Sequence, residues 1–531
     1  MQPGARGEPS LVSPGLIGLA LLLAAVFLIA HAYYPGLPAA GTEIGGWRTW
    51  ADQSRYIEAA RAWARWDLSP SSHWYPPGYA LLGSLLLPLT PHDRFLLPNL
   101  ACLVASQFAC TALARRLFPE NWFASLLGAG AFLIASIGTM PGLKSWLIPW
   151  STTPSATLTF AALVAILRLS ERPSISSALL AGSAIGGITL FRPGDAAPVA
   201  LAAVVALTPI LLALPTRRAI GIAAAAVLTT VVWIAVTVGI IDATSGLGLG
   251  TYSALSARLG FEFRLLPLRW VTFMIDARPI FDGVGTQRIE AGLHRGMCEV
   301  FPWIIPGIGG VAACWFGCGS RRVHVLLVTW LALHLALMLS YRDLHTLGFW
   351  LFGNYHYFKV TQPIFLLYAL VLVSRLADRA IRWRSAFAAF AAVVLAFGWR
   401  ASLVPLPVEL PPAAAHSVAV APLSRLDDAA IVPGTGTWNA FYVDDQVLTI
   451  GGERFYSLYD FRLYPRFGDF LLVPLRPLPP GSGVLTVARG VHIEPDARAR
   501  AARQTITFGL PCAFGLAGYA VCGNLGAPLI P

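Results

Sequence analysis

The chain has 531 residues, of which 56% are hydrophobic and 12% carry a charged side chain. Soluble domains average about 25% charged residues, so the composition excludes an ordinary soluble protein and indicates that much of the apolar surface faces lipid. The net charge of +11 comes from basic residues between long apolar runs, which is typical of cytoplasmic loops, and we expect no nucleic-acid partner. Because every backbone polar group in a bilayer must be satisfied within the protein, these long runs predict helices.

The apolar runs predict the transmembrane helices. A helix needs roughly 20 mostly apolar residues to cross a bilayer, and on this basis residues 1–400 form an all-α polytopic membrane domain of about eleven transmembrane helices. A signal-peptidase-like Ala30-His31-Ala32 follows the first run, so its cleavage stays open. The predicted helices lie near residues 13–31, 95–114, 122–140, 149–168, 175–191, 195–214, 219–241, 301–318, 323–340, 358–374 and 385–400.

Arginine residues gather in alternate short loops and predict the orientation of the chain. Cytoplasmic loops are the basic ones, so we predict a cytoplasmic N-terminus, two long outer loops at 33–94 and 242–300, and an outer location for everything after residue 400. We therefore expect a multi-pass protein of the bacterial inner membrane, with its C-terminal part in the periplasm. The basic loops carry Arg115, Arg116, Arg168, Arg172, Arg217, Arg218, Arg321, Arg322, Arg375, Arg379, Arg382 and Arg384.

Residues 401–531 differ from the rest of the chain in their pattern of polar and apolar residues. Short segments in which polar and apolar residues alternate are separated by Gly and Pro, which predicts strands and a small β-rich extracytoplasmic domain. Cys512 and Cys522 both lie in this part and are candidates for a disulfide, because the periplasm is oxidising.

The first outer loop contains the segment TWADQSRYIEAARAWARW. Asp52 and Tyr56 are four residues apart and share a face if the segment is helical, and the tryptophans that follow favour the headgroup level of a bilayer. We predict a short helix along the outer membrane surface, with Asp52 near its start. The alternative is that Asp52 only caps this helix, since Thr49-Trp50-Ala51-Asp52 fits a capping box.

A second short helix is predicted in the same loop, after His73-Trp74-Tyr75-Pro76-Pro77. Gly78 lets the chain turn, and the apolar stretch that follows is too short for a span, so an interfacial or re-entrant helix fits better. His73 and Tyr75 are candidates to line a sugar site, because aromatic faces stack on sugar rings. The alternative is that they anchor the loop at the interface.

These motifs, in this order, resemble those of GT-C glycosyltransferases of the aminoarabinose and mannosyl transferase type. The resemblance rests on D-x-x-x-Y-x-x-x-A-R from Asp52, the Y-P-P-G-Y at 75–79, the ARRLF at 114–118, and NYHYFKVTQPIFLLYALVLV at 354–373. It covers the architecture of residues 10–400 and leaves out the C-terminal part. It implies an enzyme that takes a sugar from a polyprenyl-phosphate carrier on the non-cytoplasmic face.

Carried over residue by residue, the resemblance gives Asp52 contact with the acceptor and the role of a catalytic base, or of a metal ligand as in metal-dependent branches of the family. It assigns the donor phosphate to the late segment, where Lys359 is the main candidate and His356, Arg342 and Tyr357 assist. The chain departs from the family here, because His356-Tyr357 stands where Arg-Tyr is usual. A lysine binds phosphate as a point charge, without the bidentate fork of arginine.

Other polar residues of the outer loops are weaker candidates. The substrate-binding candidates are Tyr56, His73, Tyr75, Asp343 and Glu262, and for the last two the alternative is a solvated loop. Arg192 and Asp195 bracket Pro193-Gly194 at another outer turn, and we expect them to pair with each other.

The function predicted from the sequence is an inverting glycosyl transfer in a single displacement, from a polyprenyl-phosphate sugar to a periplasmic lipid, glycan or protein. The sequence leaves open whether a divalent cation is required and does not indicate one, since a hard metal ion prefers several oxygen ligands and only one acidic residue lies at the predicted site. The alternatives are a polymerase or ligase that uses a polyprenyl-diphosphate glycan, a transporter, and a non-catalytic envelope-assembly protein.

Overall fold

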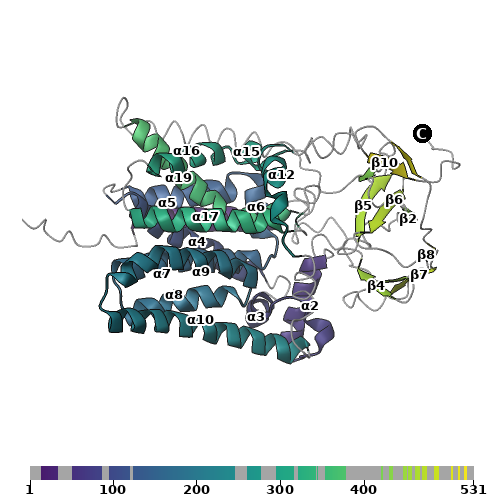
Figure 1. Cartoon of the computed structure of the whole chain (residues 1–531), viewed down its shortest axis with the longest axis horizontal. Helices are drawn as coiled ribbons and strands as arrows, with labels where there is room; N and C mark the ends of the chain where they lie inside the picture. The colour runs from purple at the N-terminus through teal and green to yellow at the C-terminus, as the bar shows by residue number, and fades with distance from the viewer. Residues whose placement is uncertain are drawn as a thin grey trace, which may run out of the picture.

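The computed structural model describes nine stretches in the helical part of the chain, and ten short strands further on. The nine stretches are residues 13–33, 51–86, 95–119, 123–245, 260–276, 295–315, 321–341, 344 and 353–377. The strands lie between residues 420 and 522, where the backbone alone is described. Within the nine stretches the chain is a bundle of helices (Figure 1).

The helices follow the apolar runs of the sequence. The first part contains α1 (Pro14–Tyr33), α2 (Ala51–Ala64), η3 (Pro70–Ser72), α3 (Pro77–Leu85), α4 (Leu96–Leu117), α5 (Ala124–Ile137), α6 (Met140–Leu147), α7 (Thr152–Glu171), α8 (Ile175–Ile188), α9 (Pro193–Leu212) and α10 (Thr216–Ser245). The second part contains η4 (Phe263–Leu265), α12 (Leu266–Trp270), η5 (Val271–Ile275), α15 (Met297–Val300), α16 (Ile304–Trp315), α17 (Arg321–Ser340), η6 (Asn354–Phe358) and α19 (Thr361–Ala377).

Six of the described helices are long and apolar enough to cross a membrane, or seven if the bent pair α5 and α6 is one span. Helices α8, α16 and α19 and the α12–η5 segment are apolar but shorter. A polytopic helical membrane protein is therefore confirmed, whereas the count of about eleven stays a prediction. The segment predicted near 385–400 lies outside the described residues.

The span predicted near 122–140 differs from the structure. Helix α5 ends at Ile137, and α6 leaves it at an angle of 88°. The cause is a new helix start: the Thr139 hydroxyl accepts a hydrogen bond from the Gly142 backbone N–H at 3.1 Å, and Pro141 occupies the first turn. The turn brings α6 across the end of the bundle, and its last residues lead directly into the start of α7.

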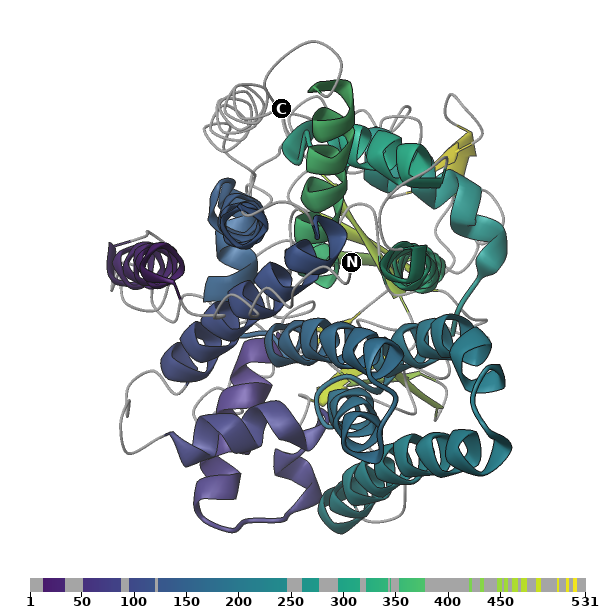
Figure 2. The ribbon, with the colours of Figure 1, turned by 90° about the vertical axis from the view of Figure 1, so that its left-hand side faces the viewer.

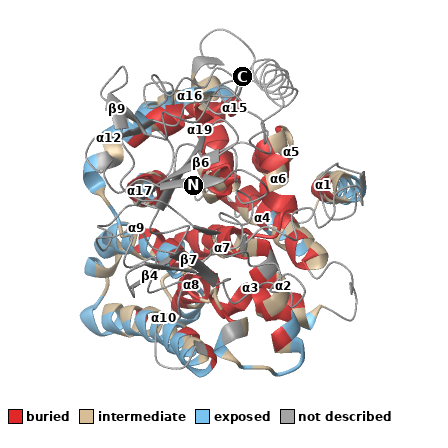
Figure 3. Ribbon diagram, turned by 90° about the vertical axis from the view of Figure 1, so that its right-hand side faces the viewer, coloured by how far each residue is buried: buried red, intermediate tan, exposed pale blue. Residues whose placement is uncertain are grey.

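Burial separates the helices that hold the site from those that face lipid. Helix α7 is buried along most of its length, whereas α10 is exposed along most of its own (Figure 3). Seen along the bundle, α1 lies at its edge (Figure 2). An exposed α10 can still pack closely on α8, because Gly182 and Gly186 let the two backbones approach, and an added Cβ at Gly182 would collide with the Ala226 carbonyl.

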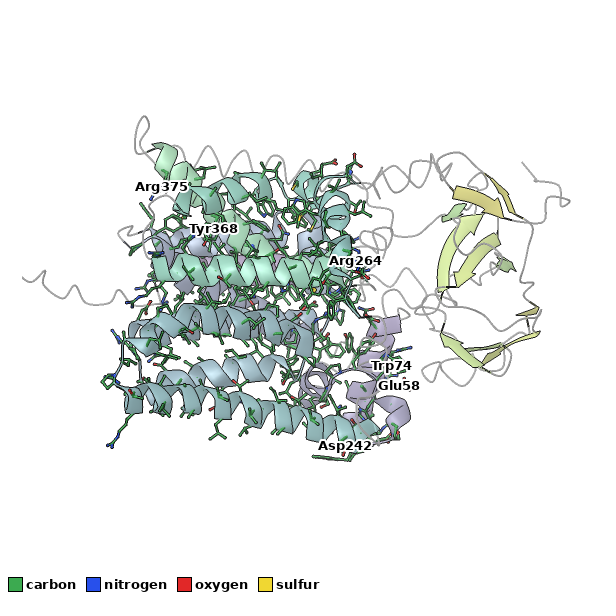
Figure 4. All side chains as sticks on the ribbon, viewed as in Figure 1. Glu58, Trp74, Asp242, Arg264, Tyr368 and Arg375 are labelled. Atoms are coloured by element: carbon green, nitrogen blue, oxygen red, sulfur yellow. The ribbon has the colours of Figure 1, made fainter. Side chains whose placement is uncertain are left out.

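The two ends of the bundle carry different side chains. Arg375 lies at one end, while Glu58, Trp74, Asp242 and Arg264 lie at the other (Figure 4). At the arginine end, the loops predicted to be cytoplasmic contact one another through three arginines, whose partners are Glu171 for Arg116, the Pro173 carbonyl for Arg218 and the Ser170 carbonyl for Arg322. The assignment of this end to the cytoplasm stays a prediction.

The strands form three antiparallel sheets. They are β1 (Val420–Pro422), β2 (Ala430–Pro433), β3 (Val447–Ile450), β4 (Glu453–Tyr456), β5 (Phe461–Arg466), β6 (Asp469–Pro474), β7 (Val484–Ala488), β8 (Gln504–Thr505), β9 (Cys512–Phe514) and β10 (Tyr519–Cys522). Their orders are β1-β10-β9, β2-β6-β5 and β4-β3-β7-β8. Cys512 stands opposite Cys522 in the register of β9 and β10. One extracytoplasmic domain containing all three sheets stays a prediction.

Candidate active site

Asp52 lies in the first turn of α2, and its carboxylate meets the loop that leads into α3. The Tyr75 hydroxyl donates to Asp52 Oδ1 at 2.5 Å. Tyr56, one turn further along α2, packs its ring against Tyr75 with centroids 4.8 Å apart. The structure therefore brings three of the predicted residues together, and Tyr75 acts on the carboxylate itself.

Burial raises the pKa of the Asp52 carboxyl above its usual range. Three neighbours act in the opposite direction: the hydrogen bond from Tyr75, and the positive charges of Arg55 and Arg192. Arg55 is itself buried, with its guanidinium 4.0 Å from the centroid of the Trp74 ring. A carboxylate with a raised pKa is a stronger base than one in water, which suits it to take a proton from a hydroxyl.

The first turn of α7 connects the separate parts of the site. The segment Trp150-Ser151-Thr152-Thr153-Pro154-Ser155 presents four hydroxyl groups, each bound to a side chain from a different part of the chain. The pairs are Ser151 Oγ with Tyr56 Oη at 3.0 Å, Thr152 Oγ1 with His356 Nδ1 at 2.9 Å, Thr153 Oγ1 with Lys359 Nζ at 2.6 Å, and Ser155 Oγ with Asp195 Oδ2 at 2.6 Å. We call Ser151, Thr152, Thr153 and Ser155 the α7 hydroxyl turn.

The backbone of the α7 hydroxyl turn is largely occupied. The Thr153 N–H donates to the Trp150 carbonyl and the Ser155 N–H to the Ser151 carbonyl, while Pro154 has no N–H. A helix start usually offers several free N–H groups to an anion. Here the side chains are the groups available for binding.

Lys359 is a buried cation whose described partners are all uncharged. Its ammonium donates to the Ser145 carbonyl at 2.7 Å and to Thr153 Oγ1, and lies 4.8 Å from the centroid of the Trp146 ring. Among the residues that the structure describes, no carboxylate lies within ion-pair distance of it. Burial lowers the pKa of Lys359 well below its usual range, and the charge of Arg192 lowers it further. An incoming anion would stabilise the charged form.

His356 lies next to Lys359 and is held flat between two rings. Its imidazole stacks on Trp150 at 3.9 Å and 13°, and on Tyr357 at 4.2 Å. Burial, together with the charges of Lys359 and Arg192, lowers the pKa of His356 well below its usual range. These effects favour the neutral form of the ring.

Arg192 and Asp195 pair as expected, at 3.1 Å between Nε and Oδ2. The structure adds contacts that the sequence does not show. The Arg192 guanidinium lies 4.5 Å from the centroid of the Tyr357 ring, and Asp195 is 8% exposed and accepts from Ser155. The charge of Arg192 acts on Asp52 as well as on His356 and Lys359. It is the cation common to both halves of the site.

Two other candidates have local partners. His73 Nε2 lies 2.7 Å from the Asp67 carbonyl, and its ring lies 5.0 Å from that of Trp63, so it joins two parts of its own loop. Glu262 caps η4 through the Arg264 N–H, and its own N–H donates to the Ser340 carbonyl at 2.7 Å. Arg342 and Asp343 lie outside the described residues.

Sequence reasoning missed Arg55 and the α7 hydroxyl turn. Arg55 follows Asp52 by three residues on α2, so helical spacing was a usable signal. The hydroxyl run Ser151-Thr152-Thr153 was a weaker signal, since such residues are common at helix starts for capping alone. Among the described residues, no cluster of three His, Cys, Asp or Glu side chains is placed to hold a metal ion.

No family model matches the chain, and neither does any curated protein. Solved structures do match. ArnT from Cupriavidus metallidurans bound to undecaprenyl phosphate has a TM-score of 0.44 and 14% identity, over 71% of this chain and 62% of ArnT. ArnT in the apo state has a TM-score of 0.45 and 14% identity, over 75% and 66%. The arabinosyltransferase EmbB from Mycobacterium smegmatis has a TM-score of 0.39 and 14% identity, over 70% and 32%.

These structures are GT-C glycosyltransferases. They are enzymes of the kind that the sequence motifs resemble. The chain spans 62% of the length of ArnT in the first match, and all three TM-scores are below 0.5. The function proposed below therefore rests on the side chains of this chain.

Proposed function

We propose that this protein is a membrane glycosyltransferase that takes a sugar from a polyprenyl-phosphate carrier at the outer face of the bacterial inner membrane. The observation that carries the proposal is the α7 hydroxyl turn. It binds Tyr56, from the helix of the candidate base Asp52, and Lys359, a buried cation without a described carboxylate partner. One helix start thus contacts both the helix that carries Asp52 and the buried Lys359.

The proposed reaction is a single displacement. A hydroxyl or amine of a periplasmic lipid, glycan or protein attacks the anomeric carbon, and the bond from that carbon to the phosphate oxygen breaks. Asp52 takes the proton from the attacking group, and the electron pair leaves with the polyprenyl phosphate. The configuration at the anomeric carbon inverts, and no covalent enzyme intermediate forms.

Lys359, which is buried, and Arg192, which is partly exposed, have their largest effect on the leaving group. Negative charge grows on the phosphate oxygen as the bond breaks, and a donor already in place in a dry site is worth about 10²–10³ in rate. Lys359 and Arg192 supply such charge, and Arg192 also lowers the pKa of Asp52. This second effect keeps more of the base ionised near neutral pH.

The proposal is tested by assaying purified protein in nanodiscs against a panel of radiolabelled polyprenyl-phosphate sugars. The variants are Asp52→Asn and, as a matched control on the same helix, Glu58→Gln. We expect wild type and Glu58→Gln to release polyprenyl phosphate, and Asp52→Asn to lose at least about 100-fold in rate with its helical content intact. Full activity in Asp52→Asn would return Asp52 to a capping role. No turnover by wild type with any donor would contradict the proposed reaction.

A periplasmic C-terminal part would also contain a disulfide. Residues opposite one another in antiparallel strands have Cα atoms about 4.5–5.5 Å apart, which is within the range of a disulfide. Cys512 and Cys522 are opposite one another in this way. Peptide mapping of protein purified without reductant should find the two cysteines crosslinked, and two free thiols would contradict both the disulfide and its oxidising compartment.

A further inference from the structure

His356 has one nitrogen without a described partner. The side chain is 2% exposed, Nδ1 is bound to Thr152 Oγ1, and Nε2 has no hydrogen-bond partner among the residues that the structure describes. A buried polar atom left without a partner costs about 1–3 kcal/mol. What distinguishes this atom is that the charges of Lys359 and Arg192 act on the same imidazole.

The ring cannot turn this nitrogen elsewhere at low cost. Trp150 covers one face at 3.9 Å with an interplanar angle of 13°, and Tyr357 stacks at 4.2 Å. A rotation about χ2 would drive the ring edge into the two stacked neighbours and break the bond to Thr152. The position of Nε2 is therefore fixed before any ligand arrives.

The contact with Thr152 decides which nitrogen carries the proton of the neutral ring. Thr152 is the first residue of α7, where the helix dipole places positive potential. A lone pair facing that helix end is stabilised there, while an N–H facing it is destabilised. This potential favours donation from the Thr152 hydroxyl to Nδ1, an arrangement that leaves the proton on Nε2.

We infer that Thr152 is a positioning residue that holds His356 as its Nε2–H tautomer, so that Nε2–H donates a hydrogen bond to a phosphate oxygen of the lipid-linked substrate. The choice of ligand rests on the proposed function, whereas the tautomer does not. Lys359 and His356 together then present a charged and a neutral donor, which gives two directed contacts where a lysine alone gives a point charge.

The tautomer is measured first, on the full chain without substrate. Protein with ¹⁵N-labelled histidine is compared in wild type, His356→Gln and Thr152→Val, and the missing signal in His356→Gln identifies His356. We expect a protonated Nε2 and an unprotonated Nδ1 in wild type and in Thr152→Ser, and a changed pattern in Thr152→Val. A protonated Nδ1 in wild type would overturn the inference whatever the enzyme does.

The ligand contact is measured by the affinity of undecaprenyl phosphate in nanodiscs, in a double-mutant cycle. We expect Thr152→Val and His356→Ala each to weaken binding about tenfold, the size of one lost hydrogen bond to a charged group. The double variant should be no weaker than His356→Ala alone, because Thr152 acts through His356. Thr152→Ser should restore affinity, and Thr157→Val, on the same helix, should leave it unchanged.

Equal and additive losses would overturn the inference, since Thr152 would then act without His356. The same double-mutant cycle with inorganic phosphate tests whether His356 contacts any phosphate or only the phosphate of the lipid carrier. Coupling with both ligands supports a contact to any phosphoryl group, and coupling with undecaprenyl phosphate alone supports the lipid carrier. Binding of neither ligand by wild type would contradict the donor site of the proposed function, while the histidine spectrum still decides the tautomer.

Discussion

The two halves of the candidate site hold their charged groups in opposite ways. Asp52 has a hydrogen-bond donor, Tyr75, and two nearby arginine charges, all of which favour its ionised form. Lys359 has a carbonyl, a hydroxyl and an aromatic ring as direct partners; burial lowers its pKa, and the charges of Arg192 and Asp195 act on that pKa in opposite directions. One half is built to keep a carboxylate ionised despite burial, and the other to gain from an added anion. This asymmetry is what a base and a leaving-group site require.

The largest effect is expected from removing the ammonium group of Lys359. Lys359→Met should lower the rate by about 10²–10³ through lost stabilisation of the leaving phosphate, with Lys359→Arg recovering part of it. The measurement is kcat and KM for the most active polyprenyl-phosphate sugar. A change in KM alone would mean that Lys359 binds ground state and transition state equally.

Arg192→Met tests the residue that acts on both halves. Its loss removes a positive charge that lowers the pKa of Asp52, so that pKa should rise, and the acidic limb of the pH–rate profile should move to higher pH. The rate should also fall by about tenfold or more on the leaving-group side. A lower rate with an unmoved acidic limb would separate Arg192 from Asp52 and confine it to the anion half.

Tyr75→Phe acts on the base half alone. The hydrogen bond from Tyr75 favours the ionised carboxylate, so its removal should raise the pKa of Asp52. Because the base must be deprotonated, the rate should fall at neutral pH by a few-fold to about tenfold and recover at higher pH. A uniform loss at every pH would instead indicate that Tyr75 contacts the substrate.

The smallest effect is expected from the hydrogen bond between Tyr56 and Ser151, which connects α2 to α7. Ser151→Ala removes the hydroxyl that accepts from Tyr56, at a cost of about 0.5–1.5 kcal/mol, and should lower kcat by a few-fold without moving the pH profile. Thermal unfolding in the same nanodiscs separates a loosened site from a destabilised fold. A kcat equal to that of wild type would show that α2 is positioned by its other contacts, such as Gln53 with the Pro149 carbonyl.

The sequence was sufficient for the helical membrane fold and for Asp52 and Lys359 as candidates, because apolar runs and spaced motifs are local signals. It made Tyr75 a candidate to line a sugar site or to anchor the loop, but it did not show that the hydroxyl of Tyr75 binds Asp52, 23 residues away. Contacts at this distance depend on how α2 folds back on α3, which no local pattern records. The α7 hydroxyl turn was missed for the same reason, since Thr152 and His356 are separated by 204 positions.

The backbone of the α7 hydroxyl turn determines how strongly amino-acid substitutions would alter the proposed site. A phosphate cradle made of backbone N–H groups survives most substitutions, because every residue except proline supplies the same donor. Here two first-turn N–H groups are already bonded and Pro154 supplies none, so a phosphate bound as proposed would meet hydroxyls, an imidazole and an ammonium. Each of these groups is lost or replaced by a single substitution. A point mutation of one of these side chains can therefore change what the proposed site binds, while the helix that holds them together stays as it is.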